Sequence, residues 1–264
     1  MIGAIAGDII GSVHERANIK QLDFQLFQKN SSFTDDTALT LAIADAILNE
    51  KPYALMVHNY GNTYSKRGYG GMFRKWLKTP LDQIEPYNSF GNGSAMRVSP
   101  VAWAFKTIDR VLEEARRTAI ITHNHPEGVK GAQAIAAAIH LAHIGKDKKV
   151  IKNYIQKQFD YDLDRTVEQI RPKYKFDVTC QGSVPESIIA FLDSDNLEHA
   201  IRLGISLGGD ADTIACMAGA IAQAYYKEIP MVIYNKVKEI LGADLWRLVK
   251  QFEEIYKINY KLLA

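Results

Sequence analysis

Apolar residues recur at helical spacing along most of this chain. In residues 37–50 they stand three or four positions apart, so one face of a helix would carry Leu39, Ile43, Ala46 and Ile47. The same spacing predicts helices in three further segments: 128–145, 212–228 and 231–263, the last broken near Gly242. Alternating patterns are scarce, and the best strand candidate is the short "KYKFDVT" (173–179). The spacing therefore predicts an all-α fold.

The N-terminal segment, which also reads as a helix, carries a glycine at every fourth position. Gly3, Gly7 and Gly11 would stack on one side of it, although each glycine costs a helix about 1 kcal/mol relative to alanine. This spacing indicates that another backbone comes very close. In a membrane it would suggest helix dimerisation, but the segment is too short and carries a charge. We therefore predict close packing inside a tight bundle.

Length and composition limit the class of protein. The chain has 264 residues, no Pro/Ser-rich linker and no internal repeat, so we predict a single domain over residues 1–264. Hydrophobic residues make up 47%, enough for a large core, and the net charge of +2 does not favour a nucleic-acid or membrane-surface partner. The two cysteines, Cys180 and Cys216, form no disulfide framework and favour a reducing compartment.

The N-terminal segment "MIGAIAGDIIGSVHER" does not resemble a signal peptide. It has no basic start, and Asp8 interrupts its apolar run. No apolar run in the chain reaches the length that spans a bilayer. We therefore expect a soluble cytoplasmic protein.

Two acidic segments stand directly before predicted helices. Each alone reads as a helix cap, because threonine caps and aspartate favours the positive helix end. If the two met, their four carboxylates would repel one another unless a cation lay among them. Oxygen ligands of this kind suit Mg²⁺, Mn²⁺ or Ca²⁺ rather than zinc. The segments are "TDDT", with Thr34, Asp35, Asp36 and Thr37, and "DADT", with Asp210, Asp212 and Thr213.

Two further segments suggest a ligand less strongly. Asn92-Gly93 in "SFGNGSAMR" is typical of a hairpin turn, but the residues after it read as helix, and a glycine-rich turn before a helix suits a phosphate. In "THNHPEG", a turn with Pro126 starting a helix is the first interpretation for His123 and His125. A substrate contact is the second, and zinc is the last because no further ligand cluster accompanies them.

Together these segments resemble the ADP-ribosylglycohydrolases of the dinitrogenase-reductase-activating type. The resemblance rests on "GAIAGDIIGSVHE", "FTDDTALT", "SFGNGSAMR", "THNHPEG" and "GGDADTIACMAGAI", which follow one another in the family's order from residue 3 to about residue 220. The occurrence of DDT and GGDxDT in one chain is specific, whereas each half alone is not.

The resemblance implies a compact, single-domain orthogonal helical bundle with two Mg²⁺ (or Mn²⁺) ions. Thr34, Asp35 and Asp36 match the first ligand group of the family. Asp210, Asp212 and Thr213 match the second. Glu15 matches a glutamate on a mobile loop near the ribose. The residues that match the ADP-ribose-binding segments are Tyr69, Gly70, Gly71, Ser89, Phe90, Gly91, Asn92, Gly93 and His123.

The activity implied by the resemblance is hydrolysis of the bond at C1″ of ADP-ribose. Either Glu15, or Asp36 acting on a metal-coordinated water, would handle the protons. The partners would be ADP-ribose and an ADP-ribosylated protein or small acceptor, with nucleic acid only as a modified substrate, and a monomer is expected. The bond to be cleaved stays open among arginine, serine, a nucleic-acid end and small molecules.

Two other classes of protein fit the sequence less well. A catalytically silent ADP-ribose-binding or structural relative is expected to lose metal carboxylates, but all four aspartates and Glu15 are present. A two-metal nucleotide phosphohydrolase would need an ExxE pattern or a His-Asp pair, and neither stands at a suitable place. The enzyme is therefore the favoured hypothesis.

Overall fold

The computed structural model describes all residues, 1–264, and confirms the all-α prediction. It contains fourteen α-helices, one 3-10 turn and two three-residue strands. In chain order these are α1 (Ile2–Gly11), α2 (Asp35–Leu48), α3 (Tyr53–Thr63), α4 (Gly71–Lys78), η1 (Leu81–Gln83), α5 (Gly93–Met96), α6 (Ser99–Ala104), α7 (Ile108–Ala119), α8 (Pro126–His143), α9 (Lys148–Phe159), α10 (Val167–Ile170), α11 (Cys180–Leu192), α12 (Leu197–Ser206), α13 (Ala211–Tyr226), β1 (Glu228–Pro230), α14 (Met231–Ile255) and β2 (Lys261–Leu263).

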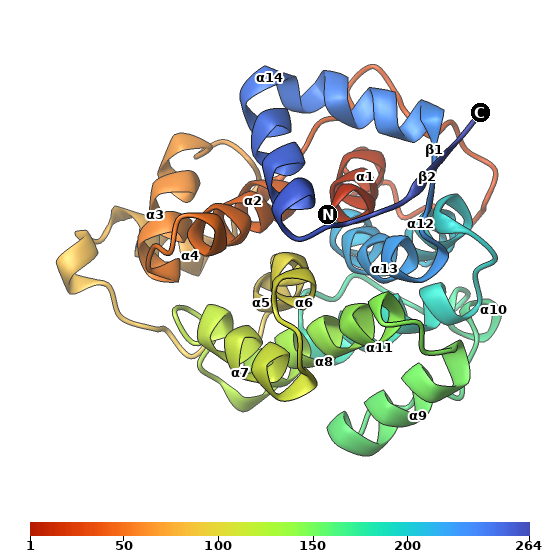
Figure 1. The fold of residues 1–264 in the computed structure, drawn as a ribbon. Coiled ribbons are helices and arrows are strands. Elements are labelled where there is room, and N and C mark those ends of the chain that lie inside the picture. Colours follow the sequence, from red (N-terminus) through yellow and green to blue (C-terminus); the bar gives the residue numbers. More distant parts are fainter.

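Helices α1 and α13 share the most extensive contact of all helix pairs and lie at the centre of the fold (Figure 1). Every residue of α1 is buried. A Cβ atom added at Gly3 would overlap the carbonyl of Gly219, and one at Gly7 would overlap that of Ala215. The predicted close approach of a second backbone is thus confirmed. At the other end of α1, Gly11 lies against the backbone of Asp212, so this packing also positions one of the acidic segments.

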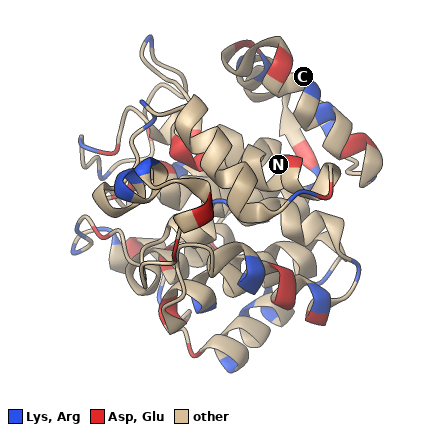
Figure 2. Cartoon of the chain, turned by 90° about the vertical axis from the view of Figure 1, so that its left-hand side faces the viewer, with Lys and Arg blue, Asp and Glu red and all other residues tan.

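Charged residues of both signs are scattered over the helices. Figure 2 shows lysine and arginine interspersed with aspartate and glutamate, without a continuous stripe of one sign on the face in view. This distribution agrees with the nearly balanced net charge of +2.

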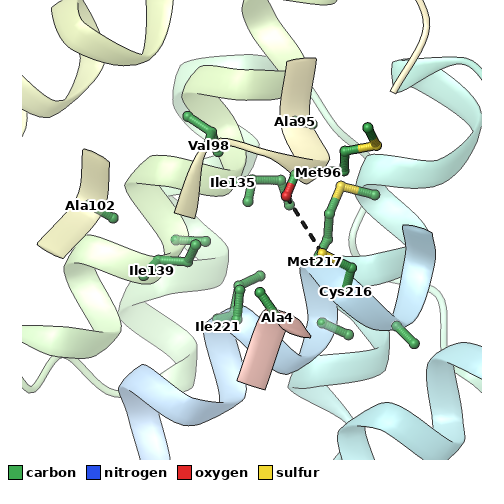
Figure 3. Packing of buried hydrophobic residues seen from close by; sticks show 14 of the residues in the cluster. Ala4, Ala95, Met96, Val98, Ala102, Ile135, Ile139, Cys216, Met217 and Ile221 are labelled. Carbon is green, nitrogen blue, oxygen red and sulfur yellow. Dashed lines mark hydrogen bonds between the residues drawn. The ribbon is translucent and has the colours of Figure 1, made fainter. Parts of the chain in front are cut away.

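One connected cluster of buried hydrophobic residues runs from Met1 to Ile258. Part of it lies where α1, α5, α8 and α13 meet, and Figure 3 shows Ala4, Met96, Ile135 and Met217 packed there. In the same region the thiol of Cys216 donates to the carbonyl of Met96 over 3.5 Å. This core fixes the N-terminal end of α13 relative to α5.

The C-terminal part confirms one prediction and corrects another. Helix α14 bends at Gly242, whose φ of 71° and ψ of 178° are not helical, as the predicted break requires. The prediction of a strand at "KYKFDVT" is wrong. Residues 174–178 form an irregular loop, and only Thr179 makes an isolated β-bridge, to Gly91. Asp177 accepts a hydrogen bond from the backbone of Thr179, which turns the chain into α11 instead of extending a strand.

None of the helices is both long enough and apolar enough to span a lipid bilayer.

Candidate metal centre and ligand cleft

The two acidic segments meet, although 177 positions separate them in the chain. The hydroxyl of Thr213 at the start of α13 donates to Asp36 Oδ2 over 3.3 Å, and the hydroxyl of Thr34, which donates to Asp8, lies 3.1 Å from the same oxygen. One carboxylate oxygen from each of Asp8, Asp36 and Asp212 lies within 4.8 Å of the other two. The sequence could not show this convergence, because it depends on how α1 and α13 pack.

Asp8 is the residue of this centre that sequence reasoning missed. It lies on α1 and accepts four hydrogen bonds: from the amide and hydroxyl of Thr34, at 2.9 and 2.6 Å, from the amide of Thr37 at 3.1 Å, and from the hydroxyl of Thr37. Because both oxygens are used in this way, Asp8 positions the first acidic segment and is less suited to bind a metal itself. The one feature of the sequence that could have pointed to Asp8 is that it is the single charged residue in a helix of small and apolar residues.

Asp210 and Asp212 do not act as helix caps. Asp210 occupies the N-cap position of α13, but its side chain makes no capping bond. Its Oδ2 instead accepts a hydrogen bond of 2.6 Å from the side-chain amide of Asn92, and Asp212 Oδ1 accepts one of 3.0 Å from the amide of Thr213. By contrast, Thr34 does cap α2. Asn92 therefore links the glycine-rich segment to the second acidic segment.

The carboxylates of the centre have no lysine or arginine partner, and burial raises their pKa values. Burial, with nearby Asp8, raises the pKa of Asp35 to about 8, and burial raises the pKa of Asp210 to about 6. The pKa values of Asp36 and Asp212 move in the same direction, first through burial and then through neighbouring carboxylates. Asp36 Oδ1 is buried without any hydrogen-bond partner. An oxygen-only donor set with an unpartnered buried carboxylate oxygen fits a hard divalent cation.

A cleft of about 630 Å³ opens beside these carboxylates. This volume lies within the usual range for small-molecule sites. Fifteen of the sixteen site residues predicted from the sequence line it: Glu15, Thr34, Asp35, Asp36, Gly70, Gly71, Ser89, Phe90, Gly91, Asn92, Gly93, His123, Asp210, Asp212 and Thr213.

Tyr69 is the predicted site residue that the cleft does not include. Its side chain is buried, its ring centroid lies 5.1 Å from that of Phe73, and its hydroxyl has no partner. The cleft is lined instead by its neighbours Gly70 and Gly71, beside which no atom would lie within 4 Å of an added Cβ.

His123 lies against the glycine-rich segment. A Cβ added at Gly93 would stand 3.1 Å from His123 Nε2, and one at Gly91 would stand 3.6 Å away. Burial and then the charge of Arg97 hold the pKa of His123 well below its usual value, so the ring is neutral at pH 7. His125, in contrast, caps α8 by accepting from the amide of Glu127, which supports the turn interpretation for that residue.

Arg97 is a second residue that sequence reasoning did not identify. It lines the cleft but is fully buried, and one terminal nitrogen donates to the carbonyl of Thr118 and to the hydroxyl of Thr122, at 2.9 and 2.8 Å. Burial without a carboxylate lowers the pKa of Arg97 to about 10. Thr122 also lies 2.7 Å from Nδ1 of His123, so this buried arginine supports the wall that carries the histidine.

Glu15 lies in the turn that follows α1 and is half-buried. It lines the cleft and also a smaller pocket next to it. Glu15 is therefore the acidic side chain that borders both spaces.

Comparisons with known proteins agree over nearly the whole chain. A family model described as ADP-ribosylglycohydrolase matches residues 1–261. The "ADP-ribosylhydrolase ARH3" of Mus musculus is 29% identical over 305 residues, covering 86% of this chain and 82% of the relative. The "ADP-ribosylarginine hydrolase Tri1" of Pseudomonas putida is 24% identical and covers 98% of this chain and 80% of the relative. A solved "ADP-ribosylglycohydrolase-related protein complex" has a TM-score of 0.63 at 22% identity, covering 97% of this chain and 94% of its own, which shows a shared fold.

Proposed function

Because the chain belongs to the ADP-ribosylglycohydrolase family, we propose that it hydrolyses the glycosidic bond at C1″ of ADP-ribose and depends on two divalent metal ions. The observation that carries this proposal is the convergence of Asp36 and Thr213 from segments 177 positions apart. Similar proteins named as ADP-ribosyl hydrolases support the same reaction class.

The metal ligands that we propose lie on both acidic segments: Thr34, Asp35, Asp36, Asp210, Asp212 and Thr213. Their fit to a hard cation rests on the oxygen-only donor set and on the unpartnered Oδ1 of Asp36. Mg²⁺ or Mn²⁺ bound there would hold the vicinal ribose hydroxyls and lower the pKa of a water molecule. Asp8 keeps Thr34 in place, and Asn92 orients Asp210.

Glu15 is the residue that we propose for proton transfer. It lines the cleft near the carboxylates but belongs to neither acidic segment. A carboxylate in this position can take a proton from the attacking water or return one to the departing acceptor. Asp36 is the alternative, although its Oδ2 already accepts from Thr213.

The rest of the cleft suits the nucleotide part of the substrate. Gly91 and Gly93 leave space beside the neutral ring of His123, where larger residues would crowd it. Phe90 is 45% exposed and offers an aromatic face to a base. We propose that Gly70, Gly71 and Ser89 complete the binding surface, because all three line the same cleft.

The test is an assay of ADP-ribose release from peptides modified at serine or arginine, with Mg²⁺ or Mn²⁺ added. Release that is lost with chelator and in the variant Asp212→Ala would support the enzyme. Tight binding of ADP-ribose with no release from any substrate would instead favour the silent relative. The single domain over residues 1–264, the monomeric state and the cytoplasmic location stay predictions from the sequence.

A further inference from the structure

We propose that a second pocket, next to Glu15, receives the acceptor and that it selects acidic peptide segments. This inference rests on the proposed function, because an acceptor exists only if the chain cleaves ADP-ribosyl bonds. The pocket has a volume of about 380 Å³ and is lined by Glu15, Arg16, Asn18, Lys175, Phe176 and Gly209.

The position of the pocket points to the acceptor. It shares Glu15 with the main cleft, and its Gly209 directly precedes Asp210. It shares none of the glycine-rich residues or His123, which line the nucleotide part of the cleft. A group attached to C1″ of a ribose held by the carboxylates would therefore leave the cleft past Glu15 into this pocket.

The walls of this pocket are two loops, one around Arg16 and Asn18 and one around Lys175 and Phe176, and both are held against the second acidic segment. Gly208 and Gly209 have φ values of +73° and +76°, and an added Cβ at Gly208 would overlap the side-chain oxygen of Asn18. A Cβ at Gly209 would stand 3.2 Å from the carbonyl of Lys175. Lys20 ties the loops together by donating to the carbonyls of Tyr174, at 2.8 Å, and Leu207. The two glycines of "GGDADT" thus allow both loops to pack closely against the second acidic segment.

The pocket carries two cations, Arg16 and Lys175, against the single carboxylate of Glu15, so its net charge favours an anion. Arg16 and Lys175 are exposed, and neither takes part in an ion pair or a side-chain hydrogen bond. Asp177, the acid nearest to Lys175 in the loop, does not line the pocket and accepts from the amide of Thr179 at 2.8 Å. Guanidinium and ammonium groups bind carboxylates through charge-assisted hydrogen bonds. A modified arginine keeps a positive charge, so these two cations would repel it.

A peptide fits this pocket better than a nucleic acid. Nucleic-acid binding requires a stripe of basic residues along the backbone path. Charges here are mixed, the net charge is +2, and Figure 2 shows no such stripe on the face in view. Phe176, at 55% exposure, supplies an apolar wall beside the two cations. This combination suits one or two carboxylate side chains next to the modified residue.

The experiment compares kcat/KM for ADP-ribose release from serine-modified peptides that differ only in their flanking residues, Glu or Gln. We expect the kcat/KM of the wild-type protein to be about fivefold higher for the Glu peptide at low salt. This is the effect expected from two exposed charge–charge contacts. The double variant Arg16→Gln/Lys175→Gln should bring this ratio close to one. The matched control Lys146→Gln/Lys149→Gln removes the same charge from exposed residues elsewhere and should keep the ratio.

The outcomes separate this inference from the proposed function. Equal cleavage of both peptides by wild-type protein overturns the acceptor pocket and leaves the hydrolase intact. Release from no substrate overturns the hydrolase itself. Faster cleavage of an arginine-modified peptide, or of an oligonucleotide modified at its terminal phosphate, than of the Glu peptide also overturns the inference.

Discussion

The hydroxyl of Thr213 lies 3.3 Å from Oδ2 of Asp36 and joins the starts of α13 and α2. Thr213 donates to this oxygen, so the chain itself satisfies Oδ2 and leaves Oδ1 buried without a partner. A buried carboxylate oxygen without a donor is costly in a folded protein. Its presence beside further carboxylates is best explained by a cation that binds there.

Replacing Asp36 tests this explanation. We expect Asp36→Asn to reduce ADP-ribose release by about 100-fold or more, since even changes behind metal ligands cost about 10–100-fold. In chelator at pH 8 the same variant should melt at a higher temperature than wild type, because one of several mutually repelling buried charges is gone. Release is measured with purified protein, and melting is measured by calorimetry.

The control is Asp244→Asn, which removes a charge from an exposed ion pair with Arg247 on α14. It should leave both release and melting temperature nearly unchanged, because such exposed pairs contribute little. Normal release by Asp36→Asn would remove this residue from the proposed metal ligands.

Asp8 should matter as much for the site as for stability. In Asp8→Ala the amide and hydroxyl of Thr37 lose their acceptor, at a cost of about 1–3 kcal/mol for each buried group left unpaired. We expect a lower free energy of unfolding and weaker metal binding, as measured by denaturant titration and calorimetric titration. Asp8→Asn keeps one acceptor oxygen and should fall between alanine and wild type. Unchanged metal affinity in both variants would mean that Asp8 has a purely structural role.

Helical periodicity and spacing predicted the fold because they act locally. Leu39 and Ile43 are buried as predicted, although α2 is buried on nearly every side and Ile47 is only half-buried. The break at Gly242 occurs where predicted, and Gly3 and Gly7 contact α13 through their backbones. These features depend on neighbouring residues along one helix, so one sequence contains enough information to recognise them.

The arrangement of the site depended on contacts that the sequence does not display. From the sequence alone, Asp8 is only a charge that interrupts an apolar helix. Its role depends on four hydrogen bonds from Thr34 and Thr37, which are distant in the sequence. Tyr69 stands beside two glycines that line the cleft, but its side chain points into the core. Arg97 follows a glycine-rich segment, and nothing local predicts that it is fully buried. Each of these positions was decided by tertiary packing.

Metal binding should depend on pH with a definite sign. Burial raises the pKa of Asp35 to about 8 and that of Asp210 to about 6, whereas both lie near 4 in the unfolded chain. In metal-free protein, the stability associated with these protonated groups is present below pH 4 and is lost as pH rises through 6 to 8. A bound cation removes that penalty. We therefore expect the metal-induced rise in melting temperature to grow from pH 5 to pH 8, and a rise that shrinks over this range would contradict the raised pKa values.

The packing of α1 against α13 can be tested with one added methyl group. In Gly7→Ala the new Cβ would overlap the backbone of Ala215, with no flexible side chain to yield. Overpacking costs about 1–3 kcal/mol, and a chain of this size loses about 2–4 °C per kcal/mol. We expect a clear fall in the melting temperature. Gly71→Ala is the control, since no atom lies within 4 Å of its added Cβ, and an equal fall there would refute the argument from close packing.

A substitution at Glu15 distinguishes a role in proton transfer from a role in metal binding. It lines the cleft but belongs to neither acidic segment, so Glu15→Gln should leave the metal-induced rise in melting temperature unchanged. Loss of a general acid or base costs about 100- to 10,000-fold in rate, and we expect a fall in kcat of that size with a small change in KM. Because Gln keeps the shape of the side chain and one acceptor oxygen, a role limited to positioning would give a much smaller loss. Near-normal turnover with intact metal binding would exclude Glu15 from the chemistry and leave Asp36 as the group that handles the proton.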